Sequence, residues 1–281
     1  MVSKGYHKSR GHDKGHTTAS TPDGPASSWK CPPGYRIILA EDFEGDSLNE
    51  SNWEYQNGDG SQFGIPGWGN GEHQVYDPSA TRVADGNLII TARRDPNQWG
   101  MWISGKLISH PSHDFTYGRV EARIKFPTEE GSFPAFWMLP RDWSYGGWPR
   151  SGELDVVEYQ SAWSSNPTSR TRGSAHTQEH HANNSISQDI PAGSPADIWH
   201  IYALDWTPTQ ITWSRDGKPY MSHHRPIIHS PDNWPFDKPF HLLLNLAIQP
   251  SWGSVAEAHV DRMEMRVDWV RVTQPEDAQG Q

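Results

Sequence analysis

Three carboxylic acids lie within six residues of one short, otherwise apolar segment. Residues 151–159 read Ser-Gly-Glu-Leu-Asp-Val-Val-Glu-Tyr, with acids at Glu153, Asp155 and Glu158. Burying carboxyl groups is costly unless they are paired or take part in chemistry. Two carboxyl groups held about 5–5.5 Å apart are what retaining glycoside hydrolysis requires, one as nucleophile and one as acid and then base. The segment therefore predicts a pair of catalytic carboxyl groups.

The geometry of a strand decides whether these acids can meet. Side chains alternate along a strand, so Glu153 and Asp155 share a face and Glu158 falls on the opposite one. A one-residue bulge at Val156 or Val157 returns Glu158 to the first face, and such bulges are frequent beside active sites. A central Asp155 can then share a proton and separate the pKa values of its neighbours. The alternative is acidic alternation on a solvent-facing edge strand.

The elements around this segment have the pattern of antiparallel strands. In residues 117–126, apolar Val120, Ala122 and Ile124 alternate with charged side chains, which indicates one buried and one solvated face. Similar runs occur at residues 87–93, 133–139, 202–206, 211–214, 240–248 and 265–272. No segment keeps an apolar period of 3.6 residues, so helices should be few and short. The pattern predicts an all-β sandwich or jelly roll.

Composition excludes several classes of protein. The chain has 281 residues, with 24 Lys plus Arg, 34 Asp plus Glu and a formal net charge of −10, which argues against nucleic acid and anionic membranes as partners. The mean hydropathy is −0.80, and no run approaches the roughly 20 apolar residues of a membrane helix. A single cysteine, Cys31, excludes internal disulfides and multi-cysteine metal sites.

Tryptophan is over-represented, with 15 residues against 8 phenylalanines. An indole offers a flat apolar face and one edge N–H, a combination that suits the CH face and hydroxyl rim of a sugar ring. About half of these residues are assigned to the core, because a β-sandwich also buries aromatic rings. The remainder predict a carbohydrate cleft.

Composition also divides the chain. Residues 1–28 contain Gly, Ser, Thr, Lys and His with almost no aliphatic side chain, and we expect a disordered tail. The tail has positive charge but lacks the apolar stretch of a secretory signal. Residues 29–276 are predicted to form a single catalytic domain and residues 277–281 a C-terminal tail.

The segment 148–158, Trp-Pro-Arg-Ser-Gly-Glu-Leu-Asp-Val-Val-Glu, resembles the active-site signature of glycoside hydrolase family 16 in its bulged form, as in endo-β-1,3-glucanases (laminarinases). Further segments in the family's order and spacing are residues 67–72, 85–92, 117–125, 134–139, 216–217 and 267–272. The resemblance covers residues 35–274. It implies a β-jelly-roll sandwich of two curved antiparallel sheets with a concave substrate cleft.

The resemblance also implies roles for individual residues. Glu153 matches the nucleophile, Glu158 the acid/base, and Asp155 the carboxyl between them. The positions that match substrate-binding residues are Trp68, Asn70, Glu72, Trp137, Trp148, His176 and Trp252. No cofactor is implied for catalysis. A structural calcium ion is implied on the convex side, held by Glu44, the carbonyl of Gly86 and Asp268.

These features predict a retaining, endo-acting hydrolase of β-1,3-glucan that acts as a secreted monomer. Two departures bear on substrate: Gln249 and Pro250 replace the family's usual paired glycines, and residues 177–184 differ from the common form. Mixed-linkage glucan, agar or carrageenan is therefore an alternative substrate, and a non-catalytic glucan-binding lectin is an alternative function. A zinc peptidase is disfavoured: His176, Glu179 and His180 match an H-x-x-E-H pattern, but their segment lacks the apolar stripe of a packed helix.

Overall fold

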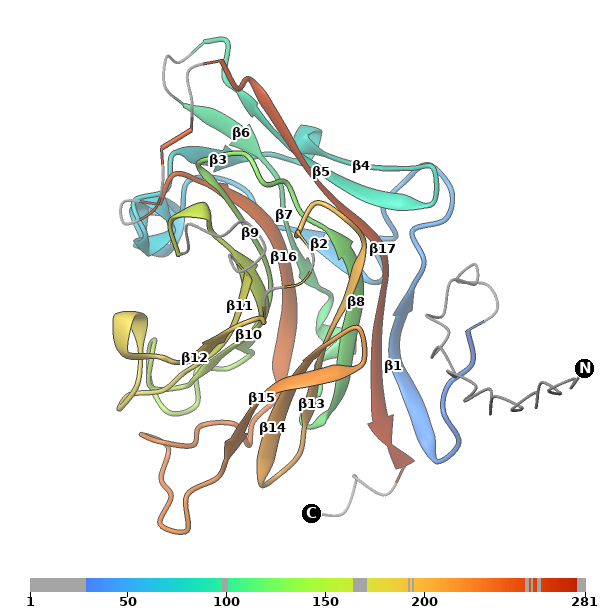
Figure 1. Ribbon diagram of the computed structural model, residues 1–281, viewed down its shortest axis with the longest axis vertical. Coiled ribbons are helices and arrows are strands. Elements are labelled where there is room, and N and C mark those ends of the chain that lie inside the picture. Colours follow the sequence, from blue (N-terminus) through green and yellow to red (C-terminus); the bar gives the residue numbers. More distant parts are fainter. Residues whose placement is uncertain are drawn as a thin grey trace, which may run out of the picture.

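The computed structural model describes residues 29–97, 101–163, 171–191, 193, 195–250, 253, 255–256 and 259–276. Regular structure in these residues is almost all strand, in two sheets that lie face to face (Figure 1). The two predicted tails, residues 1–28 and 277–281, and the predicted sugar-binding Trp252 lie outside the described residues. Within the described part, no helix is long and apolar enough to cross a membrane.

The larger sheet has ten strands. Its main path is β15 (Lys218–His224), β14 (Gln210–Arg215), β13 (His200–Trp206), β8 (Gly118–Lys125), β17 (Arg262–Pro275), β5 (Asn87–Arg94), β6 (Trp102–Ser104) and β3 (Gln74–Tyr76). Two further strands are β1 (Tyr35–Glu41), which pairs with β17, and β4 (Thr81–Ala84), which pairs with β5. The β3–β6 pair is parallel, the exception among the strand pairs described. The predicted antiparallel sheets are therefore confirmed, with this one parallel pair at the edge.

The smaller sheet has seven strands and carries the candidate catalytic segment. Its order is β12 (Ile186–Asp189), β11 (Thr171–His176), β10 (Glu153–Tyr159), β9 (Ser132–Pro140), β16 (Phe240–Ile248), β7 (Lys106–Ser109) and β2 (Trp53–Tyr55). This sheet is strongly curved, and its hollow side faces left in Figure 1, away from the larger sheet. Short 3-10 turns link the strands at Ser61–Phe63, Pro66–Gly69, Pro78–Ala80, Pro111–His113, Ser161–Trp163 and Ala182–Asn184.

The core fills the space between the sheets, as alternation predicts. On β8, Val120, Ala122 and Ile124 are fully buried while the residues between them are not. Large rings fill much of the remaining volume, including Trp206 and Trp213. The seven strand runs expected from alternation all lie on strands, and β16 has the predicted bounds. The all-β sandwich is thus confirmed, and it places β10 in the interior of the curved sheet, between β11 and β9.

Candidate active site

Strand β10 contains the bulge that the spacing of the acids requires. Asp155 pairs with Ser174 of β11, and the next pairing is Glu158 with Arg172, so β10 has one residue more than its neighbour there. The same shift separates β10 from β9 on its other side. Both residues of the bulge, Val156 and Val157, are buried. The bulge therefore brings the three acids to one face of the sheet.

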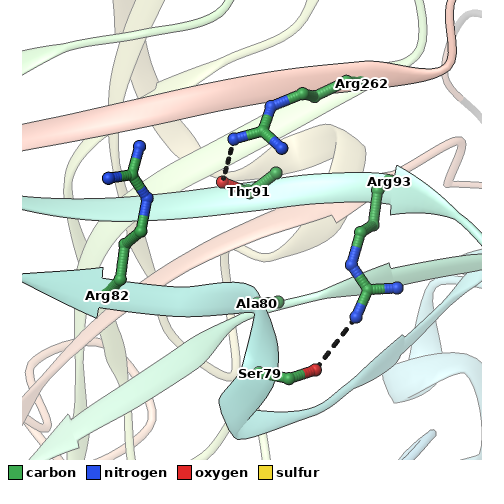
Figure 2. A pocket seen from close by; sticks show the side chains of 6 residues that line it. All are labelled: Ser79, Ala80, Arg82, Thr91, Arg93 and Arg262. Carbon is green, nitrogen blue, oxygen red and sulfur yellow. Dashed lines mark hydrogen bonds between the residues drawn. The ribbon is translucent and has the colours of Figure 1, made fainter.

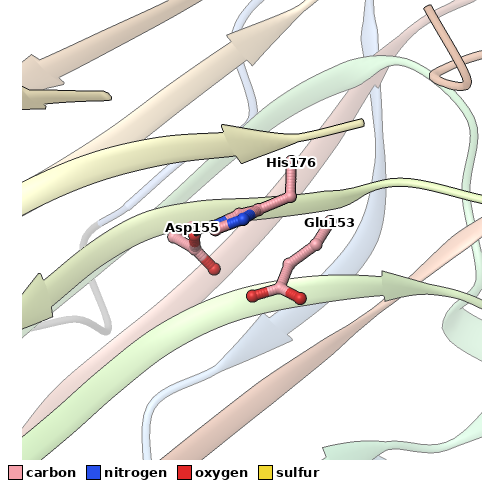
Figure 3. A group of neighbouring side chains, drawn as sticks. All are labelled: Glu153, Asp155 and His176. Carbon is pink, nitrogen blue, oxygen red and sulfur yellow. Dashed lines mark hydrogen bonds and ion pairs between the residues drawn. The ribbon is translucent and has the colours of Figure 1, made fainter. Parts of the chain in front are cut away.

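Asp155 lies between two partners at the centre of the site. Only 1% of it is exposed, and its Oδ2 accepts a hydrogen bond of 3.1 Å from Nε2 of His176. Glu153, Asp155 and His176 each place one ligand atom within 4.8 Å of the others (Figure 3). Burial, the charge of Glu153 and a hydrogen bond with it raise the pKa of Asp155 well above its usual range. These effects favour the protonated form of Asp155 beside the carboxyl group of Glu153.

The ring of His176 is held in one tautomer. Its Nδ1 accepts the backbone N–H of Ala182 at 3.2 Å, so the ring hydrogen is on Nε2 and is donated to Asp155. Ala182 has a φ of 49°, which is unusual for a residue other than glycine. The segment 177–184 therefore fixes the orientation of a side chain that contacts the central acid.

Glu153 has a tryptophan partner on the cleft side. The indole Nε1 of Trp148 donates to Oε2 of Glu153 at 2.6 Å. The indole also lies against the His176 ring, with centroids 6.0 Å apart, and against the His181 ring at 5.7 Å. Trp148 is 46% exposed. It can therefore fix the carboxylate of Glu153 while leaving an aromatic face to the cleft.

Glu158 lies farther along the same face, with its carboxyl at the cleft lining. Burial raises its pKa well above the usual range, the nearby Asp155 raises it further, and the charge of His176 would oppose the rise. The hydroxyl of Ser174 is 3.5 Å from Oε2. A raised pKa keeps this acid protonated, as a general acid requires.

A cleft of about 670 Å³ runs across the hollow sheet and contains both Glu153 and Glu158. That volume is in the range of small-molecule binding sites, about 300–1,000 Å³. Aromatic side chains dominate the lining: Phe63, Trp68, Tyr76, Phe133, Trp137, Trp143 and Trp148. The predicted sugar-binding residues Trp68, Asn70, Glu72, Trp137 and Trp148 all line this cleft, whereas His176 contacts Asp155.

The loop before β3 presents a hydrogen-bonded acid to one end of the cleft. Glu72 accepts from Asn70 at 2.9 Å, from Gln74 at 2.6 Å and from the hydroxyl of Tyr76 at 3.4 Å. Burial raises the pKa of Glu72, and these donors and Lys106 oppose the rise. The loop is thus a preformed set of polar groups beside the ring of Trp68.

Lys106 is a cleft residue that sequence reasoning missed. It is 6% exposed, and its Nζ lies 3.9 Å from the centroid of the Trp68 ring, 5.1 Å from that of Trp137 and 5.7 Å from that of Tyr76. Burial lowers its pKa to about 8, while the charges of Glu72 and Glu153 oppose this. A single cation in the otherwise uncharged run 102–109 was the available signal, because a lone charge in a buried strand needs a partner.

Asn245 is a second missed residue. Its Oδ1 accepts from Nε1 of Trp137 at 2.7 Å, and its Nδ2 donates to the Tyr76 hydroxyl at 3.0 Å. The side chain is buried on β16, a strand whose other residues are apolar except for His241. A lone amide in such a strand was the signal, and its function is to orient two aromatic side chains of the cleft.

The calcium ligands implied by the resemblance fit the structure in part. Oε1 of Glu44 lies 3.9 Å from the point where a Cβ would stand on Gly86, so the carboxylate is next to this backbone. Asp268 is engaged elsewhere, since its Oδ2 accepts from Arg123 at 2.6 Å. Its second oxygen is the one left to face a cation.

The peptidase pattern has no structural support in the described residues. His176 ends β11, and Glu179 and His180 lie in a turn, so no helix places the two histidines on one face. Glu179 is instead tied to a neighbouring loop through its N–H, which donates to the carbonyl of Asp232 at 3.0 Å.

Comparison with known proteins places this geometry among glycosidases. The family model described as "Glycosyl hydrolases family 16" matches residues 69–271. The beta-glucanase of Rhodothermus marinus is 32% identical over 254 residues, which cover 85% of each chain.

Two solved structures share the fold. The laminarinase of Flavobacterium sp. UMI-01 has a TM-score of 0.77 and 30% identity, and the alignment covers 85% of this chain and 100% of that one. The endo-beta-1,3-glucanase of Pyrococcus furiosus has a TM-score of 0.77 and 34% identity, over 85% of this chain and 94% of that one. Their strands align along most of the chain, so the cleft lies on a fold shared with these glucanases.

Proposed function

The chain belongs to glycosyl hydrolase family 16, and we propose that it is a retaining, endo-acting hydrolase of β-1,3-glucan. It is a glycoside hydrolase, and its relatives named laminarinase or endo-β-1,3-glucanase support β-glucan as substrate. The observation that carries the mechanism is the row of three acids on the bulged strand β10, in which two have raised pKa values. Both glutamates of the motif are present, which favours hydrolysis over a lectin function.

In the first step, Glu153 attacks the anomeric carbon of the sugar. The bond from that carbon to the glycosidic oxygen breaks, and Glu158 gives its proton to the leaving oxygen. Asp155 supports this step because its shared proton moves toward its own oxygen as Glu153 loses charge to the new bond. The hydrogen bond from Trp148 holds Glu153 in place for the attack.

In the second step, Glu158 is the base. It takes a proton from water, and the water oxygen attacks the anomeric carbon and releases Glu153 as a carboxylate. Two inversions at one carbon retain its configuration. The products are two shorter chains, and Glu158 has recovered its proton for the next cycle.

The cleft lining favours a neutral glucan. Trp68 and Trp137 present ring faces on which sugar CH groups can stack, and Glu72 and Asn70 offer polar atoms for hydroxyl groups. The cleft has about 670 Å³ and is lined by Trp68, Trp137, Trp143 and Trp148 as well as by the two glutamates, an extended aromatic lining that suits cleavage within a chain.

The experiment that tests this function measures reducing sugar released from laminarin, mixed-linkage glucan, agarose, carrageenan and carboxymethylcellulose. We expect the fastest release from laminarin, and early products several sugars long from endo cleavage. Glu153→Gln and Glu158→Gln should each lose nearly all activity, at least about 10³-fold, while still binding laminari-oligosaccharides. Faster hydrolysis of another polysaccharide would contradict the proposed specificity for β-1,3-glucan. Binding of a glucan without any release of reducing sugar would favour a lectin.

We also propose a structural calcium ion at Glu44 and the Gly86 carbonyl, with Asp268 as third ligand. Calcium prefers such oxygen ligands, and binding to the folded state alone stabilises it by about 2.7 kcal/mol at a hundredfold excess over Kd. We expect calcium to raise Tm and chelator to lower it, with no response in Glu44→Gln. A Tm unmoved by either would contradict the site.

We further propose that the protein acts as a monomer outside the cell. The size of a glucan polymer supports this location, because a polysaccharide chain does not cross a membrane and an enzyme encounters it outside the cell. Size-exclusion chromatography with light scattering should give the mass of one chain, and a dimer mass would overturn the monomer.

A further inference from the structure

A second cavity lies on the outer face of the larger sheet, over β4, β5 and β17. Its volume is about 110 Å³, and it is lined by Ser79, Ala80, Arg82, Thr91, Arg93 and Arg262 (Figure 2). The core side of these strands is taken by Val83, Leu88, Ile90, Ala92, Met263 and Met265. The lining side chains therefore face away from the core and from the catalytic cleft, which is on the other sheet.

The register of the strands sets two like charges opposite each other. Arg262 of β17 pairs directly with Arg93 of β5, and like charges in this position are destabilising. Glu264 lies two residues along the same face of β17, where it contacts Arg262, Arg266 at 2.9 Å and Arg82 at 3.8 Å. A single carboxylate thus contacts three guanidinium groups. Burial raises the pKa of Glu264, but Arg262 and Arg266 outweigh this effect and lower the pKa below its usual range.

Positive charge on this patch exceeds the negative charge. Arg82, Arg93, Arg262 and Arg266 carry +4 against −1 for Glu264. Asp77 brings the sum to 4 − 2 = +2. Its pKa is lowered mainly by hydrogen bonds from Ser79, with a smaller effect of Arg93, and its Oδ1 accepts from the N–H of Ser79 at 2.8 Å. The whole chain carries −10, so the patch is a local reversal of sign that would attract an anion.

The cavity has the size and donors for a small anion. Its volume equals that of about four water molecules at about 30 Å³ each, and its base includes Thr91, which is 6% exposed. Arg262 donates to the Thr91 hydroxyl at 3.4 Å, and Arg93 donates to the Ser79 hydroxyl at 3.0 Å. Each guanidinium presents a planar set of donors that matches two oxygens of one anion.

We propose that this cavity binds a tetrahedral oxyanion, sulfate or phosphate, either free or as an ester group on a glycan. The anion would lie between Arg93 and Arg262 and relieve their repulsion, with Arg82 as a third donor. Because the site is on the opposite sheet from Glu153 and Glu158, it would hold the protein on an anionic glycan without occupying the cleft. The proposal does not depend on which glucan is hydrolysed.

The first test is calorimetric titration of sodium sulfate and sodium phosphate into the protein, with chloride keeping the ionic strength constant. We expect Arg93→Gln and Arg262→Gln each to weaken binding at least tenfold. Lys218→Gln is the matched control, since it removes one exposed positive charge from β15 at the far edge of the same sheet, and binding should stay within twofold. Arg93→Lys should also weaken binding, because lysine keeps the positive charge but lacks the planar guanidinium group that can donate to two oxygens of one anion.

The second test identifies the source of the oxyanion. The Glu153→Gln protein is run in native gels that contain dextran sulfate or uncharged dextran. Retardation by dextran sulfate that is lost in Arg93→Gln and kept in Lys218→Gln supports an esterified glycan. Sulfate binding without such retardation supports a free ion. The site would be overturned if neither anion binds in calorimetry, or if Lys218→Gln loses as much anion binding as the arginine variants do. Laminarin hydrolysis at the wild-type rate shows that each arginine variant is folded.

Discussion

At the scale of single residues, the site separates three chemically similar acids by their surroundings. Asp155 is enclosed by Glu153 and His176, and Glu158 faces Ser174 at the cleft lining. Burial raises the pKa values of Asp155 and Glu158 well above the usual range of carboxyl groups. A proton on Asp155 beside Glu153 can shift toward Asp155 as Glu153 bonds to the sugar, with little movement of atoms.

The raised pKa of Glu158 predicts a dependence of stability on pH. A buried acid with a raised pKa is protonated in the folded state at pH values where the unfolded chain has lost that proton. The folded state therefore loses stability as the pH rises from the unfolded pKa toward the folded one. Glu158→Gln is uncharged at every pH, so it should raise Tm at pH 8 and leave Tm unchanged at pH 4.

Scanning calorimetry at the two pH values measures this effect. Each kcal/mol relieved should raise Tm by about 2–4 °C in a domain of this size. Glu129→Gln changes an exposed glutamate and should leave Tm unchanged at both pH values. Equal melting of Glu158→Gln and the wild type at pH 8 would show that Glu158 is not a desolvated acid.

At the scale of elements, the bulge in β10 is stabilised from the opposite sheet. A bulge removes backbone groups from the ladder, and the carbonyl of Asp155 accepts instead from Nε1 of Trp213 on β14 at 2.8 Å. The indole approaches closely because Gly173 of β11 has no side chain, and a Cβ there would lie 2.6 Å from Cδ1 of Trp213. The larger sheet thus holds the catalytic bulge in place.

Trp213→Phe should therefore lower both stability and turnover. The buried Asp155 carbonyl would lose its partner, at a cost of about 1–3 kcal/mol, and the bulge would no longer be fixed. Trp206→Phe is the matched control, because Trp206 is also buried and also donates to a backbone carbonyl, that of Phe236 at 3.1 Å. Urea unfolding and kcat on laminarin should show a stability loss in both variants and a fall in kcat in Trp213→Phe alone. An unchanged kcat in Trp213→Phe would contradict the role of this contact.

The same elements show what sequence reasoning can reach. The spacing of Glu153, Asp155 and Glu158 predicts the bulge, because only one extra residue places the three acids on one face. The spacing does not predict that Trp213 supports the bulge. Trp213 and Asp155 are 58 positions apart in the sequence, and their contact depends on how the two sheets pack. Lys106 and Asn245 were missed for a similar reason. Each is a polar residue in a buried strand, and its partners come from distant loops and strands.

At the scale of the whole molecule, the two sheets separate two kinds of site. The curved sheet carries the acids and the aromatic cleft, and the outer face of the larger sheet carries the arginine patch. Strand β17 is central to the larger sheet, because it pairs with β5, β8 and β1 along its 14 residues. The fold is therefore closed by contacts between the two ends of the domain.

This closure predicts which N-terminal truncations the protein tolerates. A chain of residues 29–276 keeps β1, and we expect its Tm to lie within about 1 °C of the full chain, with equal activity on laminarin. A chain of residues 43–276 loses β1 and the groups that bond Arg271, the carbonyl of Glu41 at 2.7 Å and the carboxylate of Asp42. Arg271 is 2% exposed, and a buried charge without its partner costs about 3–5 kcal/mol. The shorter chain should thus melt far lower or fail to fold, whereas a lower Tm in residues 29–276 would show that residues outside this range contribute to the folded domain.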